Sequence, residues 1–324
     1  MTGATGFVGS RLVERLVSTG ARVRCLLRRT SSRRYLPATG LDFAYGDLAS
    51  GEGLEGALEG ADVVFHVAGV TKARSEAEYY SGNLRGTENL LRACQNMPVA
   101  PRRIVHVSSL AAVGPSPDGK PLSEDAAPHP LTWYGRSKLA AENAVRASAL
   151  AARTVIVRPP VVYGPRDTDV FEVFRSISMG FMLLIGRQDA RFSYTHVGDL
   201  ADALVAAGGA PEGGKTYFVA NPEPVSWTAF ADTAARAMGR NGVRFVHLPV
   251  VAAYAAGWCA EAASRLRAKP GILSRQKVIE ARCPYWTCNS LRARNELALC
   301  PPRSLADGIA DTLRWYKDEG WLKF

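Results

Sequence analysis

Residues 2–9 read Thr-Gly-Ala-Thr-Gly-Phe-Val-Gly and lead directly into a helical pattern over residues 7–18. Glycines at positions 3, 6 and 9 permit a tight turn, close approach of the backbone to a pyrophosphate and close packing of the helix. The N-terminus of that helix then supplies N–H donors and the positive end of a dipole. The stretch therefore predicts a loop that binds the phosphates of a dinucleotide, although a chain with 30 glycines can also produce this spacing by chance.

Downstream of this loop, short apolar runs alternate with amphipathic stretches. The expected strands are 23–27, 41–45, 61–67, 103–107 and 154–158, and the expected helices are 7–18, 54–58, 77–94 and 133–150. Uninterrupted apolar strands that alternate with helices are typical of a parallel sheet covered on both faces. We predict an α/β fold in which a Rossmann domain spans 1–165, with 196–220 returning to its doubly wound sheet. A smaller, mostly helical substrate-binding region is expected over 166–195 and 221–324.

The first strand of this sheet is truncated in the sequence. A phosphate loop should follow a strand of about five residues at the centre of the sheet. Here Met1 stands immediately before Thr2. We expect the true start to lie upstream, the alternative being a gap in the sheet beside the neighbouring strands.

The chain of 324 residues carries a net charge of +10, which is unevenly distributed. Seven arginines and no acidic residue fall between Arg15 and Leu41, and a second basic run covers 265–294. Without a recognition motif for nucleic acid, a nucleotide explains the first run better. The second run fits solvated helix faces, an anionic group on a small-molecule substrate or peripheral contact with a membrane.

Membrane-spanning and secreted classes are not favoured by the sequence. The longest uncharged apolar stretch, 245–260, is shorter than the roughly 18 residues of a spanning helix. Six scattered cysteines and the lack of a signal peptide predict a reduced, cytoplasmic protein. Cys283 and Cys288 have no matching histidine pair, so no metal site is expected.

A tyrosine and a lysine share one helix face in Tyr134-Gly-Arg-Ser-Lys138. A nearby ammonium favours the phenolate and would lower the pKa of the tyrosine toward working pH. Tyr134 then becomes a proton donor or acceptor for a carbonyl and alcohol pair. The alternative is an exposed pair on a helix. Ser108 and Ser109 follow the strand 103–107, where a hydroxyl faces the ligand crevice; a mere loop-capping role suits Ser108 better than Ser109.

In this order and at these spacings, the three elements resemble the extended short-chain dehydrogenase/reductase family, also described as the NAD-dependent epimerase/dehydratase superfamily. Further matches are Gly46-Asp47-Leu48, Phe65-His66-Val67-Ala68-Gly69, Asn83, Arg158-Pro-Pro-Val-Val-Tyr-Gly-Pro165 and His196-Val-Gly-Asp-Leu200. The resemblance covers residues 2 to about 220 and extends more loosely to the end.

The resemblance implies roles for individual residues. The catalytic triad would be Ser109, Tyr134 and Lys138, with Lys138 also holding the nicotinamide ribose. The cofactor would be bound by Gly3, Gly6, Phe7, Val8 and Gly9 at the pyrophosphate and by Asp47 and Leu48 at the adenine. Val67 and Ala68 would lie along the cofactor, and Val162 would touch its nicotinamide side. Asn83 would either organise the active site or pin a helix to the sheet. Pairing into a homodimer through helices is a further expectation.

The cofactor can be argued from charge. An NAD site usually offers a carboxylate to the adenosine ribose about 20 residues after the glycines, but no acidic residue lies between Glu14 and Asp42. Arg28 and Arg29 follow the second expected strand instead and suit a 2′-phosphate. We therefore expect NADP(H) to be preferred over NAD(H).

Several departures from family patterns point to the substrate. Ser109-Leu110-Ala111 replaces the Thr-Asp-Glu of dehydratases, and Val161 and Phe192 replace polar contacts to a sugar nucleotide. Thr132-Trp133-Tyr134 is more similar to the 3β-hydroxysteroid dehydrogenase and dihydroflavonol reductase branch. We expect hydride transfer between a ketone or aldehyde and an alcohol on a bulky, mostly apolar substrate. Residues 248–263 would form a pocket wall or lid, or else an ordinary core helix.

Two alternatives remain open at this point. One is a nucleotide-sugar epimerase with tightly bound NAD, and the other is a non-catalytic redox sensor on the same fold. The intact Ser109, Tyr134 and Lys138 set argues against the sensor.

Overall fold

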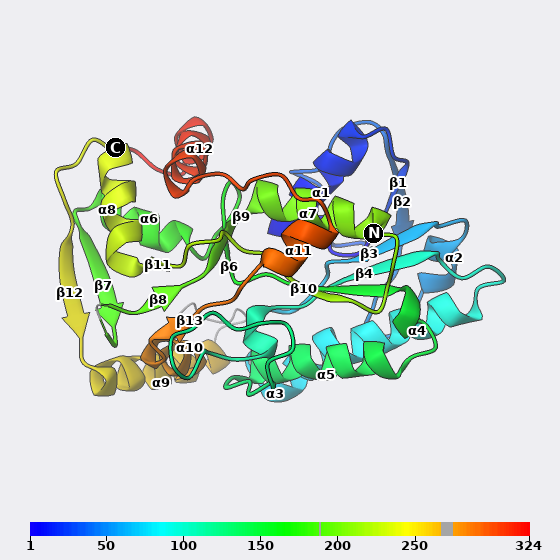
Figure 1. Cartoon of the computed structure of the whole chain (residues 1–324), viewed down its shortest axis with the longest axis horizontal. Coiled ribbons are helices and arrows are strands. Elements are labelled where there is room, and N and C mark those ends of the chain that lie inside the picture. The colour runs from blue at the N-terminus through cyan, green and yellow to red at the C-terminus, as the bar shows by residue number, and fades with distance from the viewer. Residues whose placement is uncertain (188, 267–274) are drawn as a thin grey trace.

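The computed structural model describes residues 1–187, 189–266 and 275–324, without the side chains of 259–266. One half of the molecule is a parallel sheet with helices on both faces (Figure 1). Its strands are β1 (Val23–Leu27), β2 (Leu41–Tyr45), β3 (Val63–His66), β4 (Arg103–Val107), β5 (Thr154–Arg158) and β10 (Thr216–Phe218). They pair in the orders β2-β1 and β3-β4-β5-β10, and every pairing is parallel. The predicted α/β class and Rossmann fold are therefore confirmed.

The first two residues lie between the two groups of strands. Thr2 forms parallel bridges with Leu26 of β1 and His66 of β3. The amide of Leu26 donates to the carbonyl of Met1 at 2.8 Å, and the amide of Thr2 donates to the carbonyl of Phe65 at 2.9 Å. The sheet thus reads β2-β1-Thr2-β3-β4-β5-β10, and the place expected for its central strand holds one bridging residue.

Helices cover the sheet in two layers. On one face, α1 (Phe7–Ser18) packs against α7 (Val197–Gly209), and Leu12 and Leu204 join the buried side chains of the strands. On the other face lie α2 (Leu54–Leu58), α4 (Gly86–Asn96) and α5 (Trp133–Ala147), whose core includes Leu90 and Val145. All five residues of β4 are buried because both faces are covered.

The helix expected over 77–94 is interrupted. It consists of α3 (Glu76–Tyr80), a π-helical turn η1 (Ser81–Arg85) and then α4. Such turns are rare and occur frequently at functional sites. Two short 3₁₀ helices, η2 (Leu110–Ala112) and η3 (Ala151–Arg153), flank α5 in the sequence.

A second core lies at the other end of the molecule (Figure 1). It is formed by α6 (Phe171–Ser178), α8 (Trp227–Ala237) and α12 (Leu305–Asp318), with strands β6 (Val161–Tyr163), β7 (Phe181–Ile185), β9 (Tyr194–His196) and β12 (Arg244–Leu248). Aromatic side chains dominate it, including Tyr163, Phe174, Phe230 and Tyr316.

Short elements connect the two halves. A small sheet has the order β11 (Val225–Ser226), β8 (Arg191–Phe192) and β13 (Tyr285–Trp286). The remaining helices in the described part of the chain are α9 (Val250–Leu266), α10 (Arg275–Arg282) and α11 (Leu291–Glu296). Among the helices of the described residues, none combines the length and hydrophobicity needed to cross a membrane.

Candidate active site

The glycine-rich loop is shaped by close backbone contacts. Gly3 has a φ of +71°, and a Cβ atom there would lie 2.6 Å from the amide nitrogen of Ala68. A Cβ atom on Gly9 would lie 1.9 Å from the carbonyl oxygen of Gly3. The loop can therefore fold back on itself only without side chains at these positions.

The N-terminus of α1 is open to an anion. Its N-cap is Gly6, which has no side chain to accept a hydrogen bond from the first turn, and the four residues of that turn, all described, include no acid. The N–H groups of Phe7, Val8 and Gly9 thus have no intrahelical partner in an ordinary helix. The site fits the pyrophosphate of a dinucleotide.

The loop-capping role that was expected for Ser108 belongs to Ser109 in the structure. Ser109 is the N-cap of η2, where its Oγ accepts a hydrogen bond from the amide of Ala111 at 3.1 Å. Ser108 is buried and donates to Oε1 of Glu142 at 2.5 Å. The loop-capping serine is therefore Ser109, although its side chain also forms a hydrogen bond with Tyr134.

Tyr134 lies in the first turn of α5, which begins after the N-cap Thr132. Its ring is tilted against that of Tyr79, with the centroids 6.2 Å apart. Burial raises the pKa of Tyr134 to about 12, although the hydrogen bond with Ser109 and the charge of Lys277 act in the opposite direction. The expectation of a lowered pKa is thus wrong for this structure, because desolvation of the Tyr134 phenolate outweighs the effect of the Lys277 charge.

Lys138 is buried one helical turn further along. Its Nζ donates to the carbonyl oxygen of Val107 at 2.6 Å, at the end of β4. Burial lowers the pKa of Lys138 to about 8, and the carboxylate of Glu142 partly opposes this shift. An ammonium has three N–H donors, so two remain beside the one that binds Val107.

Asn83 connects the loop after β3 to α5. Its Oδ1 accepts from the amide of Val70 at 2.7 Å, and its Nδ2 donates to the carbonyl of Val70 at 3.0 Å and to Oγ of Ser137 at 2.8 Å. The Ser137 hydroxyl in turn donates to the carbonyl of Tyr134 at 2.7 Å. The π-helical turn that carries Asn83 thus places this amide between the loop and the turn that holds Tyr134.

A buried hydrogen-bond chain links the phosphate loop to Asn83, and sequence reasoning gave it no role. The Thr87 hydroxyl donates to the carbonyl of Asn83 at 2.6 Å, so Nε2 of His66, 3.0 Å away, must donate to Thr87. Nδ1 of His66 then accepts from Thr2 at 2.8 Å, and Thr2 accepts from the amide of Ala68 at 3.2 Å. Burial lowers the pKa of His66 to about 3, which keeps the ring neutral.

The expected adenine side is built mainly from backbone. Oδ1 of Asp47 accepts hydrogen bonds from the amides of Ala49 and Ser50 at 2.7 and 3.2 Å. The carbonyl of Leu48 accepts from Nδ2 of Asn89 at 2.8 Å. Asp47 therefore shapes the turn, and Asn89, which the sequence pattern did not single out, anchors it to α4.

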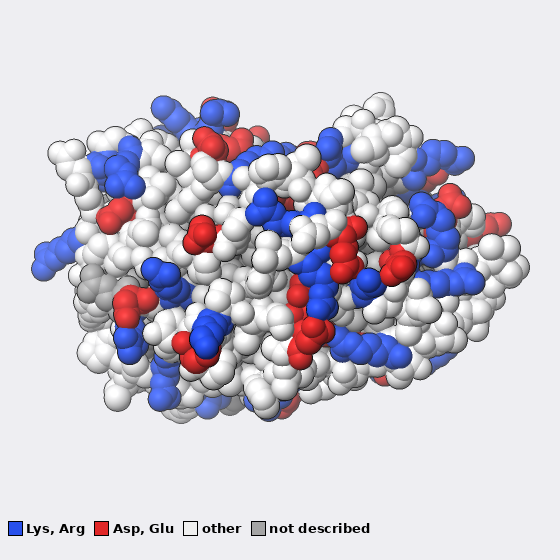
Figure 2. All heavy atoms as spheres, in the orientation of Figure 1, with Lys and Arg blue, Asp and Glu red and all other residues white. Residues whose placement is uncertain are grey.

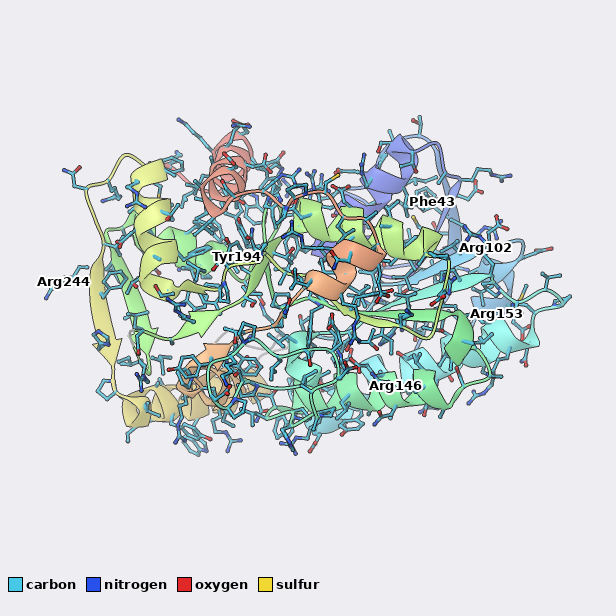
Figure 3. All side chains as sticks on the ribbon, in the orientation of Figure 1. Phe43, Arg102, Arg146, Arg153, Tyr194 and Arg244 are labelled. Atoms are coloured by element: carbon cyan, nitrogen blue, oxygen red, sulfur yellow. The ribbon has the colours of Figure 1, made fainter. Side chains whose placement is uncertain are left out.

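The arginines of the first basic run differ in their partners. Arg15, Arg22 and Arg34 form ion pairs with Asp202, Asp42 and Glu319 respectively. Arg28 and Arg29 are exposed just after β1 and have no acidic partner within the described residues. The Cζ atoms of Arg29 and Arg33 lie 5.5 Å and 4.1 Å from the ring centroids of Tyr45 and Phe43; Figure 3 labels Phe43 at this end of the molecule.

The other expected cofactor residues lie along the carboxyl ends of strands. Val67 and Ala68 follow β3 and are partly buried, and Val162 lies in β6, paired with Thr195 of β9. Val67 and Val162 both pack against the core of the Rossmann sheet.

Residues of α10 hold the start of α5, a contact that only the folded chain reveals. Oε1 of Gln276 accepts from the amide of Trp133 at 2.8 Å, and Thr132 donates to Oε1 of Glu280 at 3.3 Å. Lys277 pairs with Glu280 at 3.4 Å. Of the second basic run, Arg267 and Lys269 lie outside the described residues. Basic and acidic side chains mix over the face of the molecule shown in Figure 2.

Several known proteins are similar to this chain over most of its length. A ceramide reductase from Caulobacter vibrioides is 33% identical over 324 residues, covering 99% of this chain and 95% of the relative. A 4-hydroxy-2-methyl-3-oxo-4-farnesyl-3,4-dihydroquinoline-1-oxide ketoreductase from Stigmatella aurantiaca is 31% identical over 238 residues, covering 71% and 70%. A decarboxylating sterol-4-alpha-carboxylate 3-dehydrogenase from Candida albicans is 28% identical, covering 98% and 97%.

Solved structures share the fold. The crystal structure of gox2253 superposes with a TM-score of 0.82 at 26% identity, covering 99% of this chain and 98% of that one. MoeE5 in complex with UDP-glucose and NAD gives a TM-score of 0.76 at 26% identity, with 98% of both chains covered.

The profile of the NAD dependent epimerase/dehydratase family matches residues 1–221, about two thirds of the chain. That span contains the glycine-rich loop, Ser109, Tyr134 and Lys138. It confirms the resemblance to extended short-chain dehydrogenases/reductases and the expectation of an NAD(P)-dependent enzyme. The chain belongs to the NAD dependent epimerase/dehydratase family.

Proposed function

We propose that the chain is an NADP(H)-dependent oxidoreductase that interconverts a ketone or aldehyde and an alcohol on a bulky, mostly apolar substrate. The observation that carries the proposal is the placement of Tyr134, Ser109 and Lys138 at the carboxyl end of β4. The Ser109 side chain is hydrogen-bonded with Tyr134, and Lys138 binds the last carbonyl of the strand. Active sites of open α/β sheets lie at this edge.

The residues present fit a nicotinamide dinucleotide. The uncapped start of α1 and the side-chain-free positions Gly3 and Gly9 leave backbone N–H groups open to a pyrophosphate. The two spare N–H donors of Lys138 suit the hydroxyls of a ribose. When bound, the nicotinamide supplies or accepts the hydride.

The protein's own residues then handle the proton. Because burial holds the pKa of Tyr134 at about 12, its phenol stays protonated at neutral pH and can donate to a carbonyl oxygen. The Ser109 hydroxyl, beside that phenol, hydrogen-bonds the same oxygen and orients it. The ammonium of Lys277, whose charge acts to lower the pKa of Tyr134, stabilises the phenolate left after the transfer.

Arg28 and Arg29 support the preference for NADP(H). Both are exposed at the end of β1 and carry no ion pair within the described residues, so their charges remain available to a 2′-phosphate. Asp47, the acid nearest in the sequence after Asp42, is engaged by two backbone amides. The pattern therefore favours phosphate over a free ribose hydroxyl.

The second core supports the proposal of an apolar substrate. Phe192 is buried and stacked on Trp227, with the ring centroids 4.0 Å apart. Val161 packs against the same cluster. These two positions offer no polar group to a sugar nucleotide. The relatives that reduce a ceramide or a farnesylated quinoline oxide have names that agree with this substrate class.

The organisation of the molecule is part of the proposal. Residues 1–165 and 196–220 would form the NADP-binding domain, and 166–195 and 221–324 the substrate region. We place the protein in the cytoplasm, since Cys25, Cys94 and Cys288 are free and buried, and we propose a homodimer on the resemblance alone.

The test is a substrate screen that follows the oxidation of NADPH and NADH by the purified protein. Hydrophobic ketones and aldehydes should consume NADPH, and Tyr134→Phe should abolish turnover while Tyr79→Phe retains it. Turnover of UDP-sugars without net consumption of cofactor, and of no hydrophobic carbonyl, would instead establish the epimerase.

A further inference from the structure

Over residues 250–258, one face of α9 is exposed and apolar. Val251 is 81% exposed and Trp258 is 61% exposed. Between them the exposed positions are Ala252, Ala255 and Ala256, while the buried positions Ala253 and Gly257 lie on the side of the helix that faces the protein. Val251, Ala255 and Trp258 are spaced i, i+4 and i+7 and therefore share one face.

This pattern is the reverse of an ordinary surface helix. Helices on the outside of globular proteins carry charged and polar side chains on their solvent face. Over residues 250–258 the exposed face of α9 carries none. Contiguous exposed apolar surface of this kind marks a site of interaction.

Exposed apolar side chains also occur on the two strands β7 and β12, the second of which precedes α9. Val246 of β12 and Leu183 of β7 are direct partners in the parallel pair, so their side chains lie on the same face. They are 39% and 53% exposed. The chain passes from β12 to α9 through Pro249 alone. We call Leu183, Val246, Val251, Ala255 and Trp258 the α9 surface.

Positive charge accompanies the α9 surface. No acidic residue occurs from Arg236 to Trp258. Arg244 projects outward from β12 at the end of the molecule (Figure 3). Arg282, at the end of α10, lines a hollow of about 460 Å³ together with Val250, Val251 and Tyr254 of α9. A cation therefore lies beside the apolar face itself.

We propose that the α9 surface docks on an anionic phospholipid bilayer, with α9 lying in the plane of the headgroups. Apolar helix faces bordered by cations bind in this way, and tryptophan prefers the boundary between hydrocarbon and water. Arg244 and Arg282 would contact lipid phosphates, since basic residues near such a surface are attracted to its negative potential. A second copy docked face to face would bring the arginines of both copies into one interface, and the α9 surface offers no acidic residue to pair with them, which opposes a symmetric pair.

The inference does not depend on the proposed reaction, because binding of the protein to lipid vesicles can be measured without turnover. The full chain is sedimented with vesicles of phosphatidylcholine alone and of phosphatidylcholine mixed with phosphatidylglycerol. The test variant is the double substitution Val251→Asp with Ala255→Glu. The matched control is Val99→Asp, because Val99 is 84% exposed and lies outside the α9 surface.

We expect the wild-type chain to bind the anionic vesicles and to release them as salt is added. The double variant should bind at least about tenfold more weakly, because two acidic charges replace apolar contacts, and Val99→Asp should bind like the wild type. Thermal unfolding and NADPH binding should be equal in all three proteins, which shows that α9 is still folded. Quenching of Trp258 by brominated lipid, lost in Trp258→Phe, would support the same geometry.

Three results would overturn the inference. The first is no binding of the wild type to anionic vesicles, and the second is equal binding by the double variant. The third is a wild-type dimer in light scattering that the double variant converts to monomers without any affinity for vesicles, since the α9 surface would then be covered by a second copy.

Discussion

Glu142 and Arg158 form a buried, two-pronged ion pair beneath α5. Nε and Nη2 of Arg158 donate to Oε1 and Oε2 of Glu142 at 2.9 and 2.7 Å, and both side chains are at most 3% exposed. Ser108 and Arg146 also donate to this carboxylate. The pair connects α5, the helix that carries Tyr134 and Lys138, to the end of β5, so it helps to hold the candidate active site in place.

Replacing Glu142 by Gln should strongly destabilise the fold. The substitution leaves the guanidinium of Arg158 buried without its counter-charge, which costs about 3–5 kcal/mol in comparable pairs. Urea unfolding measures the loss in the free energy of unfolding. Glu172→Gln is the control, because Glu172 pairs with Arg175 on the surface at 2.9 Å, and surface pairs contribute at most about 1 kcal/mol. Equal losses in the two variants would contradict the prediction.

The same pair predicts a loss of stability in acid. Burial acts to raise the pKa of Glu142, but the hydrogen bond and charge of Arg158 outweigh it and hold the pKa below its usual value. A carboxyl group with a depressed folded-state pKa stabilises the fold above its unfolded-state pKa, and this contribution disappears as pH falls through the folded-state pKa. The difference in unfolding free energy between wild type and Glu142→Gln should therefore shrink in acid. A constant difference would exclude this account.

Gly9→Ala should weaken binding of the cofactor. Its Cβ atom would lie 1.9 Å from the carbonyl of Gly3, so the phosphate loop must move. Forced overpacking of this kind typically costs the fold about 1–3 kcal/mol, and a displaced loop no longer presents its N–H groups correctly to a pyrophosphate. Calorimetric titration with NADPH measures the loss. Gly56→Ala is the control, because a Cβ atom on Gly56 would meet no atom within 4 Å; an equal loss there would show that the effect is not local.

Removing the side chains of Arg28 and Arg29 should change the choice of cofactor. Each charge-assisted hydrogen bond lost to a 2′-phosphate is worth about 1.5–3 kcal/mol. The double alanine variant should therefore bind NADPH far more weakly and NADH almost unchanged. Arg22→Ala, which removes the partner of Asp42, should alter neither affinity. Similar losses for NADPH and NADH would place both arginines elsewhere than at a 2′-phosphate.

Lys138→Met should abolish turnover and yet raise the thermal midpoint at neutral pH. Burial lowers the pKa of Lys138 to about 8, so the folded state disfavours its ammonium relative to the unfolded chain. This destabilising contribution is present in full below pH 8 and fades as pH rises toward the ordinary lysine pKa of about 10.4. The two proteins should therefore approach equal midpoints in alkaline buffer. A lower midpoint for Lys138→Met at every pH would contradict the prediction.

Local pattern was enough to predict much of the fold. The expected bounds of β1, β2, β4, β5 and α1 agree with those of the structure, because each is an apolar run or face bounded by glycine, proline or polar residues. The π-helical turn at 81–85 was missed because its residues continue the same helical periodicity. A π-helix differs from an α-helix only in which carbonyl each backbone amide binds, and side-chain periodicity does not show this.

Motifs were enough to nominate the candidate catalytic residues, but not to predict their environment. Gln276 binds the amide of Trp133 across 143 positions of sequence, and no local pattern indicates such a contact. The pKa of Tyr134 was expected to fall because Lys138 is four residues away. It rises because desolvation outweighs the charge of Lys277, and contacts such as that with the Tyr79 ring come only from the tertiary structure.

The two bridges made by Thr2 have a mechanical consequence. Among the described residues, β1 and β2 join the rest of the sheet through the short backbone segment Met1–Thr2, and α1 is held to α7 mainly by side-chain packing. Such a segment can open as its own cooperative unit, below the free energy of global unfolding. Amide hydrogens of β1 and β2 should exchange before those of β4 and β5. A dinucleotide bound from Arg28 to Lys138 would contact the sheet on both sides of Thr2. The ligand itself would then hold β1 and β2 to the rest of the sheet.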